Sequence, residues 1–204
     1  MKVLLTGFEP FGGDAVNSSW EVVRSIPEIS GIELEKLLLP VSFNRAREIV
    51  KTVLQERVPD VVLSVGQAGN RGCVCLERVA INVADSRNGD VDGYCPVDCL
   101  IEAQGPVAYF STLPLRRMVD AAKDKGVQVK ISNTAGTYVC NTVFYSLLYW
   151  IKMKRLKTVA GFVHLPYLPC QIAKKPGTVA VDLSLQVSVM SAFIECLVRN
   201  TTVH

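Results

Sequence analysis

Residues 127–164 decide the fold, and they read VQVKISNTAGTYVCNTVFYSLLYWIKMKRLKTVAGFVH. Apolar spacing predicts a strand over Val127–Ile131, a helix over Tyr138–Lys152 and a second strand over Thr158–Val163. A strand, a helix and a strand of these lengths make one βαβ unit. Because such crossovers are right-handed, we expect both strands to end at the same edge of a parallel sheet.

Two reactive side chains fall at that edge. Cys140 lies in the first turn of the predicted helix, and His164 directly follows the second strand. If the two strands are neighbours, about 4.8 Å apart, the thiol and the imidazole come within bonding reach. A helix N-terminus stabilises negative charge, so we expect this position to lower the pKa of the Cys140 thiol. Cys140 would then be an activated nucleophile with His164 as its base.

The same residues also permit an inert interpretation. Cys140 shares an i, i+4 stripe with Phe144 and Leu148, so it could be an ordinary buried cysteine. The chain has two histidines, His164 and the C-terminal His204, so a mechanism that needs an internal imidazole has one candidate. A lone histidine at a strand end is also commonly structural. From the residues alone, both interpretations stay open.

A carboxylate is the candidate third member of this site. Alternation along the predicted strand Val74–Val83 puts Cys75 and Glu77 on one face. A carboxylate among apolar neighbours is costly unless it is paired, and the N–H of His164 would pair it and fix the imidazole tautomer. The alternative is a solvent-facing strand that carries Glu77 beside Arg78.

Strands and helices alternate over the rest of the chain as well. Further strands are predicted at Lys2–Thr6, Ile32–Leu39 and Val61–Val65. Helices are predicted at Ser18–Ser25 (with Asn17 or Ser18 as N-cap), Phe43–Glu56, Leu115–Lys125 and Asp182–Val198, and a polar loop at Asp85–Asp98. No linker, repeat or composition shift interrupts this order, so we expect one domain over residues 1–204. The alternation predicts an α/β fold with a largely parallel sheet, whose sites gather at the carboxyl ends of the strands.

The first predicted strand leads into a glycine-rich turn, GFEPFGG at residues 7–13. This turn lacks the Gly-x-Gly-x-x-Gly and Gly-Lys-Ser/Thr patterns of phosphate loops. Phe8 and Phe11 would instead wall a pocket for a small, flat, uncharged ligand, or pack inward and close the core. The turn motivates a second hypothesis, a non-catalytic binding module for lactam-like or nucleotide-like ligands on the same α/β scaffold.

Composition excludes several classes of function. The chain has 204 residues, of which 49% are hydrophobic and 20% charged, and its formal charge is +3. This balance gives no electrostatic case for binding nucleic acid. The most apolar stretch, Val143–Ile151, is far shorter than the roughly 20 residues that span a membrane. Residues 1–7 hold too short an apolar run for a secretory signal, so we expect a leaderless, cytoplasmic protein.

The seven cysteines motivate a third hypothesis, a thiolate metal protein. Cys73-x-Cys75 and Cys95-x3-Cys99 could supply four thiolates. Their spacings fit common zinc motifs poorly, and the sequence contains no His-Glu-x-x-His motif. We therefore expect no metal site.

Six motifs of the chain resemble those of pyroglutamyl-peptidase I, or pyrrolidone-carboxylate peptidase, the cysteine exopeptidases of peptidase family C15. They occur in family order over nearly the whole chain, at residues 7–13 (GFEPFGG), 66–69 (GQAG), 77–82 (ERVAIN), 105–110 (GPVAYF), 132–141 (SNTAGTYVCN) and 162–167 (FVHLPY). The resemblance implies a three-layer α/β/α sandwich with a mixed, mostly parallel sheet, usually assembled as a homotetramer. It implies neither a metal nor a cofactor.

The resemblance also implies the reaction, which is removal of an N-terminal pyroglutamyl residue from peptides. Cys140 would attack the carbonyl that joins this residue to the next, His164 would carry the proton, and Glu77 would orient His164. Water would then hydrolyse the thioester. The residues implied to hold the substrate are Phe8, Phe11, Asn17, Gln67, Arg87, Tyr138 and Val139.

Two stretches depart from the family pattern. Asn17-Ser18-Ser19 stands where Asn-Pro-Ser or Asn-Pro-Thr is common, and residues 88–91 (NGDV) follow Arg87 where Ile-Pro-Asp-Asn is frequent. The second departure removes a hydrophobic contact beside Arg87.

Overall fold

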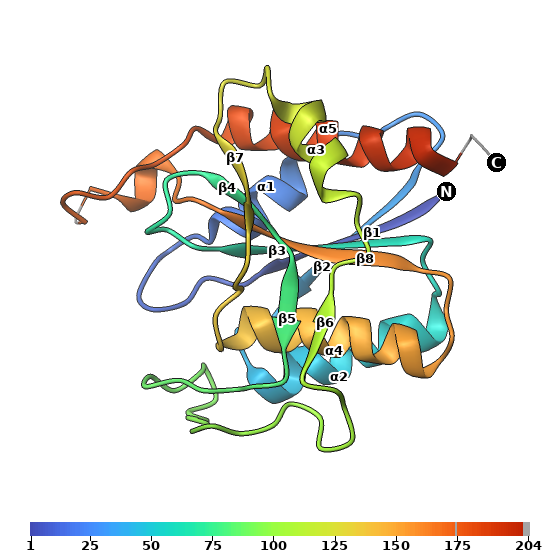
Figure 1. Ribbon diagram of the computed structural model, residues 1–204. Helices are drawn as coiled ribbons and strands as arrows, with labels where there is room; N and C mark the ends of the chain where they lie inside the picture. Colours follow the sequence, from blue (N-terminus) through green and yellow to red (C-terminus); the bar gives the residue numbers. More distant parts are fainter. Residues whose placement is uncertain (174, 202–204) are drawn as a thin grey trace.

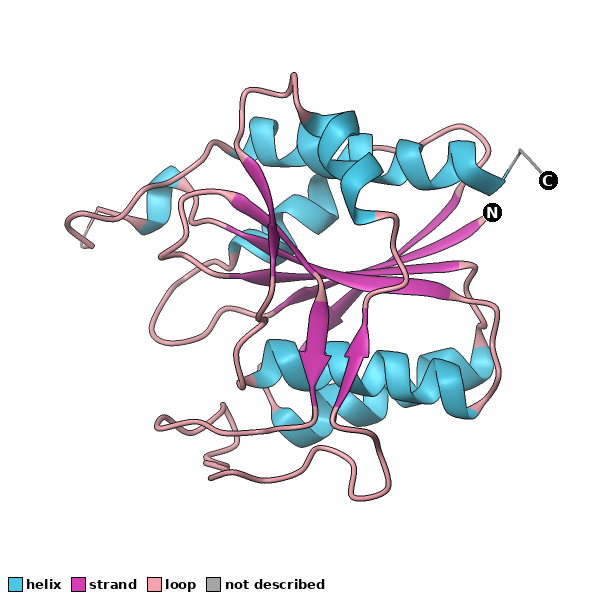
Figure 2. Ribbon diagram, in the orientation of Figure 1, coloured by secondary structure: helices cyan, strands magenta, loops and turns pink. Residues whose placement is uncertain are grey.

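The computed structural model describes residues 1–173 and 175–201. A mixed sheet of six strands lies between two layers of helices (Figures 1 and 2). Its strands, in spatial order, are β2 (Glu33–Leu39), β1 (Lys2–Phe8), β3 (Val61–Gln67), β8 (Val159–Leu165), β4 (Val74–Glu77) and β7 (Val129–Ser132). The expected three-layer α/β/α sandwich is confirmed.

The sheet is parallel from β2 to β8 and then reverses. β1 pairs in parallel with β2 and β3, and β3 pairs in parallel with β8. β4 is antiparallel to β8 and parallel to β7. β7 and β8 are therefore neither neighbours nor parallel, and the βαβ unit expected over residues 127–163 is wrong in its first half. The four residues of β4 are all buried, which suits an interior strand, whereas the partly exposed β7 takes the edge.

The helices divide between the two faces of the sheet. α1 (Ser18–Ser25), α3 (Leu115–Ala122) and α5 (Leu183–Thr201) cover one face, and α2 (Phe43–Glu56) and α4 (Val139–Met153) cover the other (Figure 1). Each face has its own apolar core. Because side chains alternate along a strand, Leu5 of β1 packs in the core under α1, α3 and α5, while its neighbour Leu4 packs in the core under α2 and α4.

The strand expected over Val74–Val83 is divided at Arg78. β5 (Val79–Ile81) leaves the central sheet and pairs antiparallel with β6 (Ala108–Phe110), a strand that the sequence did not predict. The backbone of Arg78 holds the break, because its N–H donates to Ser132 O at 2.8 Å and its carbonyl accepts from Ser111 N at 2.8 Å. In Figure 1, β5 and β6 project from the sheet alongside α4.

Other boundaries differ by a few residues. Asn17 caps α1, since its side-chain oxygen accepts a hydrogen bond from Ser19 N. α3 ends at Ala122 rather than Lys125, and a short 3-10 helix at Pro169–Gln171 was not expected. Among the residues that the structure describes, no helix is both long and apolar enough to cross a membrane.

Candidate active site

A cavity of about 230 Å³ lies where β1, β3 and β8 end and α4 begins. Eight residues singled out in the sequence line it, namely Phe8, Phe11, Asn17, Gln67, Tyr138, Val139, Cys140 and His164. The other lining residues are Val41, Ala68, Asn70, Arg71 and Ala135. Segments far apart in the chain thus converge on the nucleophile and base proposed from the sequence.

Glu77 lies behind this cavity and holds the imidazole. Its Oε1 is 2.7 Å from Nδ1 of His164, and the carboxylate is fully buried. A carboxylate can only accept a hydrogen bond, so Nδ1 carries the proton and donates. Nε2 of His164 is then the basic nitrogen. The interpretation of Glu77 as a solvent-facing residue is wrong.

Gly66 brings the thiol to the imidazole. It is the register partner of His164 in the parallel pair of β3 and β8. A Cβ atom built on Gly66 would lie 2.8 Å from Sγ of Cys140 and 2.8 Å from the ring of Phe162. The thiol therefore occupies the space over Gly66, in the cavity that His164 also lines, and no other residue type leaves that space open.

The helix–strand half of the expected βαβ unit explains this placement. α4 precedes β8 in the chain and packs against it, so the N-terminus of α4 lies near the carboxyl end of β8. Cys140 is the second residue of α4, and His164 lies one residue before the end of β8. β7 is not needed for their approach.

The pKa of Cys140 is raised, contrary to the expectation from its place at a helix N-terminus. Although Cys140 keeps some exposed surface, burial raises the pKa of its thiol to about 12. The negative charge of Glu77 acts in the same direction. Arg71 and the N–H of Cys140 itself favour the thiolate, but they are outweighed. The resting site therefore holds a thiol, which needs a base to become a nucleophile.

Arg71 is a site residue that the sequence reasoning missed. It lies in the loop between β3 and β4, and its Nη1 donates to Oε1 of Glu77 at 2.6 Å. The sequence could have indicated Arg71, because it follows the strand that ends at Gln67, at the sheet edge where the sites of α/β folds gather.

The pocket walls are apolar on two sides. Phe8 is buried at the end of β1, and the half-buried Phe11 follows it. Tyr138 packs edge-on against Phe43, with ring centroids 5.2 Å apart, and its hydroxyl donates to Gly89 O at 3.3 Å. Flat walls of this kind suit a small, planar group.

The two amide side chains of the pocket have different tasks. Nδ2 of Asn17 donates to Glu9 O at 2.9 Å, and its Oδ1 caps α1, so the residue holds the turn after β1. Oε1 of Gln67 accepts from Ser18 N and from Nε2 of Gln171, each at 2.8 Å. The backbone N–H of Ser18 used here is one that a proline at that position would lack.

Arg87 is not brought to this cavity. It is exposed in the loop after β5 and is not among the lining residues, whereas Arg71 is. The loop itself is fixed by Asp90, whose Oδ2 accepts from Phe43 N at 2.9 Å and whose Oδ1 accepts from Asp92 N and Tyr94 N, each at 2.9 Å.

The cysteines considered as metal ligands lie in separate environments. The Sγ atoms of Cys73 and Cys75 are 3.7 Å apart in the core, while Cys95 is exposed and its thiol donates to Ser86 O at 2.9 Å. Within residues 1–173 and 175–201, no group of three or more His, Cys, Asp or Glu side chains is placed to hold a metal ion.

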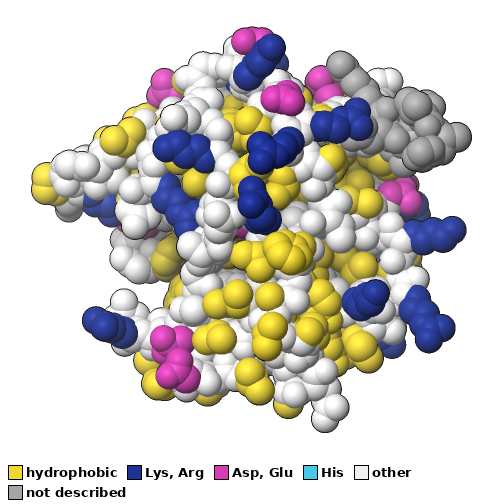
Figure 3. Space-filling view, in the orientation of Figure 1, with side chains coloured by type: hydrophobic (Ala, Val, Ile, Leu, Met, Phe, Trp, Pro, Cys, Tyr) yellow, Lys and Arg dark blue, Asp and Glu magenta, His cyan; other side chains and the backbone are white. Residues whose placement is uncertain are grey.

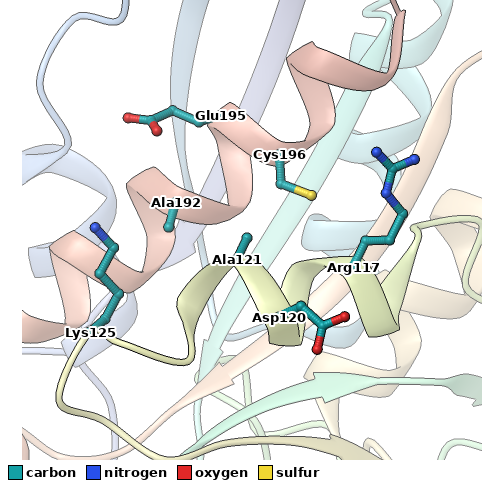
Figure 4. A pocket seen from close by; sticks show the side chains of 7 residues that line it. All are labelled: Arg117, Asp120, Ala121, Lys125, Ala192, Glu195 and Cys196. Atoms are coloured by element: carbon teal, nitrogen blue, oxygen red, sulfur yellow. The ribbon is translucent and has the colours of Figure 1, made fainter. Parts of the chain in front are cut away.

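A larger cavity, of about 520 Å³, lies between α3 and α5 (Figure 4). Its lining residues are Arg117, Asp120, Ala121, Lys125, Ala192, Glu195 and Cys196. Figure 4 shows the thiol of Cys196 reaching from α5 toward α3. No described residue of this lining is a histidine.

The sequence matches a known protein family over nearly its whole length. The family model described as pyroglutamyl peptidase, of peptidase family C15, matches residues 1–200. The chain belongs to this family. The expected family resemblance is confirmed.

Individual relatives agree with this assignment. The chain is 49% identical to a pyrrolidone-carboxylate peptidase of Thermococcus onnurineus over 177 residues, which cover 86% of this chain and 88% of the relative. It is 44% identical to a pyrrolidone-carboxylate peptidase of Clostridium perfringens over 201 residues, which cover 98% and 94%.

Solved structures share the fold. A mutant pyrrolidone carboxyl peptidase of Pyrococcus furiosus matches with a TM-score of 0.94 at 34% identity, covering 98% of this chain and 100% of the other. Pyroglutamyl peptidase I of Bacillus amyloliquefaciens matches with a TM-score of 0.91 at 36% identity, covering 96% and 93%. These comparisons give no support to the alternative of a non-catalytic binding module.

Proposed function

We propose that this chain is a cysteine exopeptidase that removes an N-terminal pyroglutamyl residue from peptides, with Cys140 as nucleophile, His164 as proton carrier and Glu77 orienting His164. The observation that carries the proposal is the contact over Gly66. The thiol of Cys140 fills the space over Gly66, the register partner of His164, and both side chains line one cavity, with the other imidazole nitrogen held by Glu77. A nucleophile, a base and a group that orients the base form the triad arrangement of acyl-transfer enzymes.

The first half of the reaction forms a thioester. Nε2 of His164 takes the thiol proton as Sγ of Cys140 attacks the carbonyl carbon of the pyroglutamyl residue. The tetrahedral intermediate then collapses, the C–N bond to the next residue breaks, and His164 returns its proton to the leaving amine. α4 begins without a side-chain cap at Tyr138, so N–H groups of its first turn can stabilise the oxyanion.

The second half restores the enzyme. Water gives a proton to Nε2 of His164 and attacks the thioester carbonyl, and the C–S bond breaks. Free pyroglutamate leaves, and the proton on His164 returns to the sulfur of Cys140. The raised thiol pKa makes His164 essential in the first half, because the thiol does not ionise alone near neutral pH.

The pocket favours the pyroglutamyl ring over ordinary N-terminal residues. The ring is a neutral lactam, so it needs flat apolar walls and amide partners rather than a charged anchor. Phe8 and Phe11 supply the walls, Val139 and Tyr138 precede the nucleophile in the chain, and the amide of Gln67 also lines the cavity. A free α-ammonium group would lose its hydration in this pocket without gaining an anionic partner among the lining residues.

The test is hydrolysis of a fluorogenic pyroglutamyl amide by the purified chain, with the matching glutamyl and prolyl amides as controls and with a reductant present. We expect turnover of the pyroglutamyl amide alone. Turnover of none of the three by the folded protein, or equal turnover of all three, contradicts the proposal.

We further propose that the chain works in the cytoplasm as a homotetramer. Support comes from exposed apolar side chains on β6 and on the loop before it, including Val97, Leu100, Val107 and Phe110. Figure 3 shows hydrophobic side chains gathered over the half of the molecule where Figure 1 places β5 and β6. Exposed apolar clusters commonly mark contacts between proteins. Light scattering after gel filtration tests this, and a monomeric mass at micromolar concentration contradicts it.

A further inference from the structure

Arg71 joins three segments of the site, and the reaction described above does not use it. Its Nη1 donates to Oε1 of Glu77 at 2.6 Å and to Oγ of Ser132 at 3.2 Å. Its Nη2 donates to the carbonyl of Thr134 at 2.9 Å. Glu77 ends β4, Ser132 ends β7, and Thr134 lies in the turn that leads to α4. One planar guanidinium thus binds both the carboxylate of Glu77 and the turn that leads into α4, the helix of the nucleophile.

The charge of Glu77 requires a partner of this kind. Its carboxylate is fully buried, Oε1 receives both Arg71 and His164, and Oε2 has no hydrogen-bond partner among the described residues. A buried carboxylate that faced His164 alone would be stabilised by a charged imidazole. A charged imidazole cannot accept the thiol proton. The permanent charge of Arg71 balances the negative charge of Glu77 without a proton from His164.

No neighbouring thiolate competes for Arg71. Cys75 is the register partner of His164 in β4 and lies close to Arg71. Burial raises the pKa of the Cys75 thiol to about 11, so this thiol stays neutral near neutral pH. The charged groups that face one another behind the cavity are therefore Arg71 and Glu77.

Arg71 also relates the base to the nucleophile in space. The carbonyl of Thr134 accepts from Arg71 and from Oγ of Ser132, which fixes the turn after β7. Five residues later α4 begins, and Cys140 lies in its first turn. Displacement of this turn relative to Glu77 would move the thiol relative to His164. Misplacement by about 1 Å is enough to slow a reaction about 100-fold.

We propose that Arg71 is a positioning residue that pairs with Glu77, aligns it on His164 and fixes the turn that carries the chain to Cys140. The inference rests on the proposed function, since it assigns Arg71 a task in that reaction. Arg71 also lines the cavity, but its guanidinium is engaged by Glu77, Ser132 and Thr134, so we assign it to positioning rather than to substrate binding.

The test compares Arg71→Gln and Arg71→Lys with the parent enzyme. For Arg71→Gln we expect kcat to fall about 100-fold with KM nearly unchanged, because positioning is lost and binding is kept. We also expect the acid limb of kcat/KM to move to higher pH, since the lost positive charge no longer opposes protonation of the site. Arg71→Lys keeps the charge but not the planar fork, so it should restore the acid limb and only part of kcat.

Arg78→Gln is the matched control. It removes the same charge one residue beyond Glu77, but Arg78 is not among the residues that line the cavity. We expect parent kcat, KM and pH profile for this variant. Thermal unfolding of each variant shows whether it is folded, and Arg71→Lys carries the test if Arg71→Gln is not.

A double-mutant cycle separates positioning from an independent effect. If Arg71 acts through Glu77, adding Arg71→Gln to Glu77→Gln lowers kcat little further. The inference would be overturned if the fold-losses in kcat of the two single variants multiplied in the double variant. It would also be overturned if Arg71→Gln kept parent kcat, or raised KM at unchanged kcat. Failure of the proposed function looks different, because the parent would then not cleave the pyroglutamyl amide, or Cys140→Ser would cleave it at the parent rate.

Discussion

Two cavities of this molecule each contain a cysteine, but they differ in volume and in the side chains that surround the thiol. The cavity between α3 and α5 is the larger, about 520 Å³ against about 230 Å³. Cys196 lies in the large one among charged side chains, whereas Cys140 lies in the small one beside His164, between apolar walls. The difference teaches that a reactive site is defined by a nucleophile placed against an oriented base, and not by the space available.

The sharpest way to break this comparison is to remove each thiol in turn. We expect Cys140→Ser to lower kcat/KM at least about 1,000-fold, because a hydroxyl is far harder to ionise than a thiol in this site. Cys196→Ser is the matched control and should keep parent activity, since its cavity contains none of the proposed catalytic groups. The measurement is hydrolysis of the pyroglutamyl amide. Equal losses in the two variants would remove the distinction between the cavities.

A methyl group at Gly66 tests the contact that brings thiol and imidazole together. The new Cβ would lie 2.8 Å from Sγ of Cys140 and from the ring of Phe162, so Gly66→Ala must displace one of them. We expect kcat to fall about 100-fold and stability to fall by about 1–3 kcal/mol.

Gly31→Ala serves as the control for this change. Its φ of +79° adds backbone strain, but nothing lies within 4 Å of the new Cβ and the residue is remote from the cavity. It should cost stability without changing kcat. Parent-like activity in Gly66→Ala would mean that the thiol does not depend on this space.

The pH dependence of alkylation tests the state of the Cys140 thiol. Its pKa of about 12 leaves only a small thiolate fraction near neutral pH. Below the pKa that fraction grows about tenfold with each pH unit, so we expect the iodoacetamide reaction to accelerate steadily between about pH 7 and pH 9. Mass-mapped labelling gives the rate at Cys140, with the exposed Cys95 measured in the same sample. A plateau below about pH 8 would instead reveal a preformed thiolate–imidazolium pair.

The smallest effect is expected at the pocket wall. Phe11→Ala removes one flat face while leaving Cys140, His164 and Glu77 in place, so KM for the pyroglutamyl amide should rise about tenfold with a smaller change in kcat. Steady-state kinetics checks this. An unchanged KM would show that the ring is held elsewhere.

Local patterns in the sequence pointed to Cys140, His164 and Glu77, although one argument for their approach was wrong, and the residues expected to hold the substrate came mostly from the family resemblance. Cys140 and His164 line the same cavity because α4 leads into β8, which apolar spacing predicts well. The direction of β7 was not predictable, because it depends on β4 entering the sheet between β7 and β8. Strand order of this kind is set by contacts distant in sequence.

The break at Arg78 and the role of Arg71 show a second limit. The alternation of apolar and polar residues predicted a strand that continues through Arg78. The chain instead leaves the central sheet there, and β5 pairs with β6, some thirty residues later. The pKa of Cys140 was also misjudged, since a helix N-terminus is visible in the sequence but the depth of burial is not. Energies that depend on enclosure can be judged only after the fold is known.

Trapping of the acyl-enzyme tests the central claim most directly. A pyroglutamyl ester is mixed with the enzyme, quenched in acid within the first turnovers and analysed by intact and peptide mass spectrometry. The account predicts one pyroglutamyl group per chain, bound as a thioester on the peptide that contains Cys140 and released by hydroxylamine. An adduct on any other cysteine, or rapid hydrolysis of the ester by the Cys140→Ala variant, would contradict it.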